Sequence, residues 1–485
     1  MPHPPIVIES IGGADRDKAR CTIEGMTMLA KKAASLKPET IIFISPHGNS
    51  FSNGTCILGD LELEGDFSQF GHSEIRFNKE VNMNLTNKIY DCFEDRHFTS
   101  VLLNEELAKS YRVKAHLDHG VMVPMYFIDQ YYTDYNIVHL TPGQTPLEEN
   151  YYLGKLIKDM VDDYTFDNPT KVLVVASGDL SHALHDSGPY AFHPQGPMFD
   201  ELVKKAIETV DPVELIKLKN SFVQDAAQCG LRSFIMGFGF MDGLDIESKV
   251  ISYEGPFGVG YLTGYLECES TLISDSLTHN RGEVKGNNQI SKIETIQDIV
   301  NNRYSQRIAK EDDYIKLARK SVEHYVHHHT KYMMEKDQFT NGFIDEAGHH
   351  KAGVFVSLHK DGKLRGCIGT TEATATNIIE EIIYNGISAC SSDPRFHPVE
   401  EDELKDLEIS VDVLGAYEGI ETMNELDIKS YGVIVEQGYK RGLLLPNLDG
   451  IASIAEQVSI AKQKAGIVSG KVKLYRFEVV RHEVD

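Results

Sequence analysis

The sequence TIIFISPHG at residues 40–48 decides the interpretation of the fold. Its apolar run at residues 41–44 is short, consists of β-branched and aromatic side chains, and stops at Ser45 and Pro46. This pattern predicts a strand that is buried on both faces. His47 follows the strand directly. Ligands of open α/β sheets bind outside the carboxyl ends of the strands, so we expect His47 at a ligand-binding edge.

Two later stretches repeat this arrangement of an apolar strand followed by polar residues. The sequence KVLVVA at residues 171–176 runs into SGDLSH, which ends at His182, and residues 250–253 run into Glu254. We expect each strand to bring a candidate ligand or base to the same edge of the sheet. Helical patterns at residues 15–36 and 148–161 separate the strands, which predicts an α/β fold with a central, mostly parallel sheet flanked by helices.

Length, charge and cysteine usage narrow the class of protein. A chain of 485 residues favours two domains. The formal net charge of −25 argues against nucleic acid and anionic membranes as partners. Seven cysteines without a CxxC pair suggest neither a disulfide framework nor a thiolate zinc site. We find no signal peptide and no apolar run that could span a bilayer, and we therefore expect a cytoplasmic protein.

The composition changes between residues 270 and 304, where apolar residues become sparse and Ser, Thr, Asn and Gly increase. The sequence beyond this stretch alternates short strands with turns and shows no repeat of the first half. We therefore predict a first domain at residues 1–269, a linker at 270–304, and a smaller α+β domain at 305–485.

A metal site is the first chemical hypothesis for the first domain. His3, His47 and Glu254 supply two imidazoles and one carboxylate, a donor set that suits non-haem Fe(II) and oxygen chemistry. The alternative is that Glu254 is a surface residue and that His47 caps a turn.

An acid–base histidine is the second hypothesis. His182 lies on a turn after a buried strand, and an imidazole titrates near neutral pH as general base catalysis requires. A Ser/His hydrolase is the competing interpretation, but the Gly-x-Ser-x-Gly motif is absent. His119 is expected at the entrance of a strand, facing the site, and His139 is expected to be a core histidine.

Five ordered motifs of the first domain resemble the class III extradiol dioxygenase family, the LigB-like domain. The resemblance covers most of residues 1–268 and rests on PHPPI at 2–6, SPHG at 45–48, LDHG at 117–120 with Val123-Pro124, GDLSH at 178–182, and YEGPFGVGY at 253–261. It implies that His3, His47 and Glu254 bind Fe(II), that His182 is the acid–base residue, and that His119 lies near substrate and oxygen. The implied reaction is oxidative ring opening beside the hydroxyl pair of a catechol-like substrate.

The second domain resembles the AMMECR domain family over most of residues 310–482. The motifs are LRGCIG at 364–369, DPRF at 393–396, LEISV at 407–411, RGLLLP at 441–446 and KAGI at 464–467. Cys367 lies between glycines near Arg365, which suits a reactive thiol, although a buried structural cysteine is the alternative.

The pair of domains resembles two parts of the AmmeMemoRadiSam system, whose third part is a radical S-adenosylmethionine enzyme. This resemblance implies such an enzyme as a partner, beside a small-molecule substrate. The Memo proteins share the first domain's fold, so the alternative function is a metal-binding partner or scaffold without ring cleavage. The substrate, a divalent metal other than Fe(II), the role of the AMMECR domain and homo-oligomer formation are left open.

Overall fold

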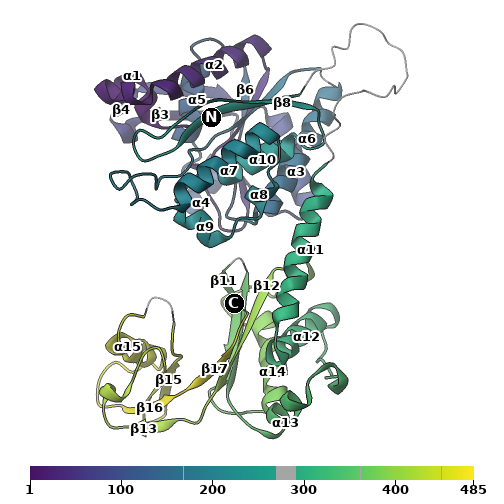
Figure 1. The fold of residues 1–485 in the computed structure, drawn as a ribbon, viewed down its shortest axis with the longest axis vertical. Coiled ribbons are helices and arrows are strands. Elements are labelled where there is room, and N and C mark those ends of the chain that lie inside the picture. The colour runs from purple at the N-terminus through teal and green to yellow at the C-terminus, as the bar shows by residue number, and fades with distance from the viewer. Residues whose placement is uncertain (168, 269–290, 361, 449–450, 485) are drawn as a thin grey trace. The chain divides into compact units, whose positions relative to one another are not determined.

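The computed structural model describes residues 1–167, 169–268, 291–360, 362–448 and 451–484 (Figure 1). The chain divides into two compact units, Met1–Ile299 and Val300–Asp485. The division falls within helix α11 (Ile293–Lys310). Part of the linker expected at 270–304, namely 270–290, lies outside the described residues, and residues 293–304 are helical in α11. The domain boundaries drawn from the sequence stay a prediction.

The first unit is built on a five-stranded sheet in the order β5-β2-β6-β1-β7. All neighbouring pairs are parallel except β2 and β6, so the predicted mostly parallel central sheet is confirmed. Its strands are β1 (Thr40–Ile44), β2 (Thr55–Leu58), β5 (Ser100–Leu103), β6 (Asn136–Thr141) and β7 (Val172–Ala176).

The burial of strand β1 on both faces of the sheet explains why its sequence is apolar without interruption. Side chains of a strand alternate between the two faces of a sheet. Ile41 and Phe43 belong to the hydrophobic core on one face, and Ile42 and Ile44 belong to the core on the other. All five residues of β1 are buried, as expected for a strand covered on both faces.

Helices cover both faces of this sheet (Figure 1). Helices α2 and α5 contribute to the core that contains Ile41, and helices α3, α6 and α10 contribute to the core that contains Ile42. The helices of the first unit before α11 are α1 (Glu9–Gly12), α2 (Arg20–Leu36), α3 (Met83–Asp95), α4 (Glu105–Tyr111), α5 (His119–Ile128), α6 (Leu147–Asp167), α7 (Gln195–Thr209), α8 (Val213–Ile216), α9 (Asn220–Asp225) and α10 (Leu231–Phe240).

Two expectations about single elements are wrong. Strand β8 (Ile246–Glu254) pairs antiparallel with β9 (Tyr261–Cys268) in a separate two-stranded sheet, so Glu254 does not follow a strand of the central sheet. His119 begins helix α5 and not a strand, because a short apolar run does not distinguish a buried strand from a buried helix. A second hairpin joins β3 (Glu62–Phe67) to β4 (His72–Glu80).

The second unit contains two antiparallel sheets in the orders β11-β10-β12-β17 and β13-β16-β14-β15. Residues of α12 and α14 share a core with the first sheet, and residues of α15 share a core with the second. The strands are β10 (Val354–Lys360), β11 (Lys363–Gly369), β12 (Leu407–Leu414), β13 (Glu418–Ile420), β14 (Gly432–Gln437), β15 (Lys440–Leu444), β16 (Lys473–Phe477) and β17 (Val479–His482). The helices are α12 (Asp313–His328), α13 (Asn341–His349), α14 (Ile378–Ser391) and α15 (Ile454–Lys464).

Within the part of the chain that the structure describes, no helix combines the length and apolarity that crossing a membrane requires.

Candidate metal centre

His47 lies just beyond the carboxyl end of β1, where the sequence predicted it. The backbone N–H of Ser45 donates to the carbonyl of Leu140 at 2.9 Å, so β1 and β6 stay paired up to this point. The N–H of His47 then donates to Ser45 Oγ at 3.3 Å. His47 is solvent-exposed, so a ligand can reach it from outside.

His3 is buried, with 1% of its surface exposed, and reaches the same edge from the amino-terminal segment. The backbone nitrogen of Met1 donates to the carbonyl of Ala176 at 2.8 Å, and the N–H of Gly178 donates to the Met1 carbonyl at 3.1 Å. The N–H of His3 donates to Asp179 Oδ1 at 2.8 Å. These bonds fix the segment of His3 against the end of β7.

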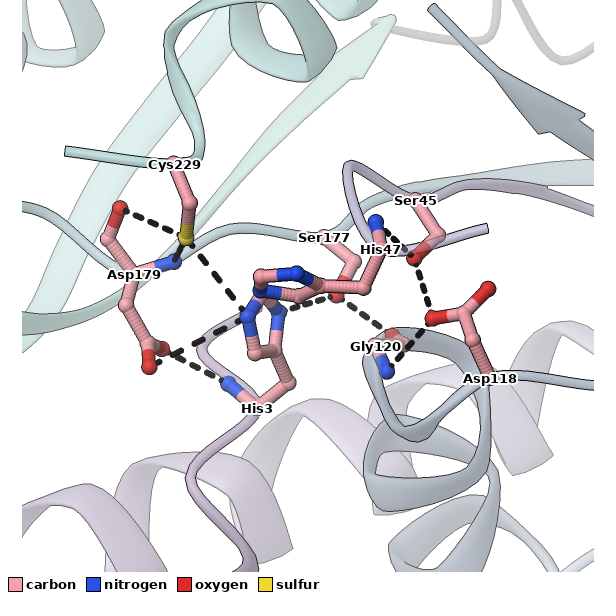
Figure 2. Close-up of polar contacts among 8 residues, drawn as sticks. All are labelled: His3, Ser45, His47, Asp118, Gly120, Ser177, Asp179 and Cys229. Carbon is pink, nitrogen blue, oxygen red and sulfur yellow. Dashed lines mark hydrogen bonds and ion pairs between the residues drawn. The ribbon is translucent and has the colours of Figure 1, made fainter. Parts of the chain in front are cut away.

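Cys229 is the third donor of the group. One ligand atom each from His3, His47 and Cys229 lies within 4.8 Å of the others, which is a candidate metal site (Figure 2). Cys229 Sγ lies 3.6 Å from His3 Nε2 and accepts the N–H of Asp179 at 3.3 Å. Sequence reasoning missed Cys229, because the residue lies between α9 and α10 in no recognisable metal-ligand spacing.

His119 lies beside both histidines of this group. Its ring stacks on that of His47 with the centroids 4.3 Å apart, and its centroid lies 5.3 Å from that of His3. Asp118 places it there by capping α5, since Asp118 Oδ1 accepts the N–H of Gly120 at 2.7 Å. The ring of Phe70 is 5.6 Å away and adds an aromatic contact.

His182 lies on the turn that follows β7 and is half-buried. Its N–H donates to the carbonyl of Ala227 at 3.1 Å, which ties the turn to the segment of Cys229. Its Nε2 is buried and has no hydrogen-bond partner among the described residues. The exposed ring of Tyr190 lies 6.2 Å from the imidazole.

Glu254 is engaged elsewhere. Its Oε1 accepts hydrogen bonds from the N–H and from the hydroxyl of Thr22, both at 2.6 Å, at the start of α2. Glu254 is not part of the three-residue group of His3, His47 and Cys229. The structure thus brings His3, His47 and His119 together, and a role of Glu254 as metal ligand stays a prediction.

Burial keeps the imidazoles of His3 and His119 neutral. It lowers the pKa of His3 well below the usual value and lowers the pKa of His119 to about 3, with the neighbouring histidines adding to the effect. Burial also raises the pKa of Asp179 to about 6. Neutral imidazoles keep a free lone pair at pH 7, which metal binding requires.

The donors fit a metal ion, with one difference from the predicted set. Two imidazoles agree with the expected 2-His-1-carboxylate arrangement, but the third donor of the group is the sulfur of Cys229. A thiolate favours softer ions such as copper or zinc over Fe(II). Burial raises the pKa of the Cys229 thiol well above its usual value, so an ion that binds here must displace the thiol proton.

The DPRF motif at residues 393–396 of the second unit forms a turn held by an ion pair. Arg395 binds Asp393 at 2.6 Å, and Asp393 Oδ2 also accepts the N–H of Cys367 at 2.9 Å. The hydroxyl of Ser357 donates to Cys367 Sγ at 3.2 Å. Cys367 is half-buried, and its assignment as a reactive or a structural thiol stays open.

Together, the mostly parallel α/β sheet and the imidazole–thiol group define a protein with a candidate metal centre at the carboxyl edge of its sheet. The chain belongs to the LigB family, described as the catalytic LigB subunit of aromatic ring-opening dioxygenase, whose model matches residues 1–264. The AMMECR1 family model matches residues 315–482. The LigB family generally depends on a non-haem metal.

Some similar proteins match the whole chain, and others match only about a third of it. The protein CA_C1420 of Clostridium acetobutylicum is 37% identical over 484 residues, which is 100% of this chain and 98% of that protein. A Thermotoga maritima protein is 45% identical over 176 residues, 36% of this chain and 98% of its own length. The solved structure of PH0010 from Pyrococcus horikoshii is 28% identical with a TM-score of 0.30, and covers 36% of this chain and 91% of its own.

Proposed function

We propose that the first unit is a metal-dependent oxidoreductase of the extradiol-dioxygenase type, acting on a small aromatic substrate with adjacent hydroxyl groups. The observation that carries this proposal is the convergence of three neutral imidazoles. The ring centroids of His3, His47 and His119 are 4.3 to 5.3 Å apart at the carboxyl edge of the sheet. Imidazoles gathered at such an edge are typical of a metal-binding active site.

His3 and His47 would hold the metal, with Cys229 as the third donor. Fe(II) is the ion that oxidative ring opening favours, and the sulfur of Cys229 leaves another divalent metal open. When bound, the ion supplies open positions for the substrate hydroxyl oxygens and for oxygen. His47 is exposed, so the substrate approaches from its side of the site.

His182 would act as the base. Its buried Nε2 has no partner among the described residues, and burial lowers its pKa, so the ring is neutral at pH 7. A neutral imidazole accepts a proton from a substrate hydroxyl group and returns it later. The rings of Phe70 and Tyr190, beside His119 and His182 respectively, offer aromatic contacts to a flat substrate.

Oxygen uptake tests this proposal. The full chain is loaded anaerobically with Fe(II), mixed with a panel of catechols, and exposed to oxygen. We expect substrate-dependent uptake in the wild type and a loss of about 100-fold or more in His182→Gln. His185→Gln is the matched control, because His185 is an exposed histidine three residues away, and it should keep full uptake. Equal uptake in His182→Gln would refute the assigned base.

A second candidate function is favoured by Cys229. A thiol within the donor group departs from the carboxylate set expected for ring cleavage, which suits a metal-binding partner or scaffold without that activity. The partner would be a radical S-adenosylmethionine enzyme. Tight binding of metal-loaded chain to such an enzyme, with no oxygen uptake on any diol, would favour this candidate over the first.

A further inference from the structure

Ser177 links His3 to the first turn of helix α5. Ser177 Oγ lies 2.8 Å from His3 Nδ1 and 2.5 Å from the carbonyl oxygen of Gly120 (Figure 2). A carbonyl oxygen only accepts hydrogen bonds, so the single hydroxyl proton of Ser177 points to Gly120. Toward His3 the serine oxygen can therefore only accept. It follows that His3 Nδ1 carries a hydrogen.

The Gly120 carbonyl is free to accept this proton because of Pro124. In an α-helix the carbonyl of residue i accepts the N–H of residue i+4. The residue four positions after Gly120 is Pro124, which lies inside α5 and has no N–H. A buried carbonyl that lacks its helical donor needs another, and the Ser177 hydroxyl supplies it.

The other end of the Gly120 peptide is fixed as well. Asp118 Oδ1 accepts the N–H of Gly120 at 2.7 Å and the hydroxyl of Ser45 at 2.6 Å. Burial raises the pKa of Asp118, but the interactions with His139 and Ser45 outweigh burial and hold the pKa well below the usual range. Asp118 is thus an acceptor only, and each bond in the series has one allowed direction.

The consequence for His3 concerns its other nitrogen. A neutral imidazole with a hydrogen on Nδ1 has its lone pair on Nε2. Nε2 is the atom that lies 3.6 Å from Cys229 Sγ, within the three-residue group of His3, His47 and Cys229. The lone pair therefore lies on the side of the ring where the other two donors are.

We propose that Ser177 and Pro124 are positioning residues that fix His3 in the tautomer whose Nε2 binds a metal ion. The inference rests on the proposed metal site, but the tautomer itself is a property of the metal-free chain. Neither residue belongs to the group of His3, His47 and Cys229. The role of Pro124 is to leave the Gly120 carbonyl without a helical N–H donor, so that the hydroxyl of Ser177 donates to this carbonyl instead.

The tautomer is measured on the metal-free full chain with ¹⁵N-labelled histidine, and the His3 signals are assigned by their absence in His3→Gln. We expect hydrogen on Nδ1 in the wild type. Ser177→Ala should shift His3 to a mixture containing the Nε2–H form, and Ser177→Thr should restore the wild-type spectrum. Pro124→Ala returns a helical donor to Gly120 and should produce the same shift with Ser177 intact. Hydrogen on Nε2 in the wild type would overturn the inference.

Metal affinity is the second readout. Zn²⁺ affinity, measured by competition with a chelator, should fall about 10- to 100-fold in Ser177→Ala and recover in Ser177→Thr. Ser233→Ala is the matched control, because Ser233 is fully buried in α10 and its hydroxyl has no partner among the described residues. Equal affinity in Ser177→Ala and Ser233→Ala would contradict the positioning role. A wild type that binds no metal overturns the proposed function alone, since the tautomer is read without metal.

Discussion

Asp118 Oδ1 lies 2.6 Å from the hydroxyl oxygen of Ser45, so one carboxylate joins the loop of His47 to the helix that begins with His119. Its other oxygen lies 3.0 Å from His139 Nε2, and both side chains are buried. The expected core histidine therefore has a buried partner. Asp118 therefore holds two segments of the candidate site at once, the loop of His47 and the start of helix α5.

Replacing Asp118 by alanine should destabilise the first unit strongly. The change removes the carboxylate that Ser45, Gly120 and His139 contact and leaves these three buried groups without their partner. We expect the free energy of unfolding to fall by about 3 kcal/mol or more. Urea-dependent hydrogen exchange of the β1 amides measures this unit separately. Asp15→Ala is the control, because the exposed Asp15–Lys18 pair should contribute less than about 1 kcal/mol. Equal effects of the two variants would contradict the assigned role.

Asp200 should make the first unit less stable as the pH rises. Its carboxyl group is buried, accepts hydrogen bonds from Ser181 and Tyr253, and has its pKa raised by burial to about 7. The unfolded value is about 3.9. Between these two values the folded state keeps a proton that the unfolded state has lost. Asp200 alone therefore lowers the free energy of unfolding by up to about 1.4 kcal/mol per pH unit from pH 4 to 7. The buried histidines with lowered pKa values contribute with the opposite sign.

Asp200→Asn isolates this contribution, because an amide does not titrate. Between pH 4.5 and 7.5 the free energy of unfolding of the variant should rise more with pH, or fall less, than that of the wild type, measured by the same hydrogen exchange of β1. If the slopes of variant and wild type coincide, Asp200 is ionised in the folded chain at low pH and the expectation is wrong.

The sequence predicted the central strand and the clustering of the histidines, but it did not predict Cys229 as the third metal donor. The alternation of Ile41 and Phe43 with Ile42 and Ile44 follows from local pattern, and so does the place of His47 after β1. Cys229 could not be found, because it lies in the connection between α9 and α10, far in sequence from His3 and His47 and in no recognisable ligand spacing.

The local sequence pattern also could not predict which sheet the strand of Glu254 joins. A strand followed by a polar residue is the same signal in a central sheet and in a separate hairpin, and the structure places β8 in the hairpin with β9. Pairing partners depend on contacts between distant segments, which a single sequence does not reveal.

Gly120 should tolerate no side chain. A Cβ atom there would lie 2.3 Å from Ser45 Oγ and 2.8 Å from Asp118 Oδ1. Gly120→Ala should therefore displace the His47 loop, lower metal affinity about tenfold or more, and destabilise the unit by about 1–3 kcal/mol. Gly342→Ala, whose Cβ would meet nothing within 4 Å, is the control and should change neither quantity by much. Unchanged metal affinity in Gly120→Ala would argue against the close packing of these loops.

Glu381 should be the main polar anchor of residues 370–375 in the second unit. Its buried carboxylate accepts the hydroxyl of Thr370 at 2.6 Å, the N–H and hydroxyl of Thr374 at 2.9 and 2.8 Å, and the N–H of Ala375 at 2.7 Å. Glu381→Gln turns an amide N–H₂ toward some of these donors. We expect a loss of about 2 kcal/mol or more and faster hydrogen exchange at residues 370–375.

The neighbouring Glu380 gives the matched control for this prediction. It lies on the same helix and pairs with Lys331 in a partly exposed position, so Glu380→Gln should cost less than about 1 kcal/mol. A comparable loss in both variants would mean that the charge of α14 matters more than the four hydrogen bonds of Glu381.

The metal content of purified chain tests the central claim most directly. Wild type, His47→Ala, Cys229→Ser and Glu254→Gln are each reconstituted anaerobically with Fe²⁺, Zn²⁺ or Cu⁺ and analysed for bound metal. We predict about one ion per wild-type chain with at least one of these metals and a loss of most of it in His47→Ala and Cys229→Ser. Glu254→Gln should keep its metal if Cys229 is the third donor. Wild-type metal content in both His47→Ala and Cys229→Ser would contradict the account.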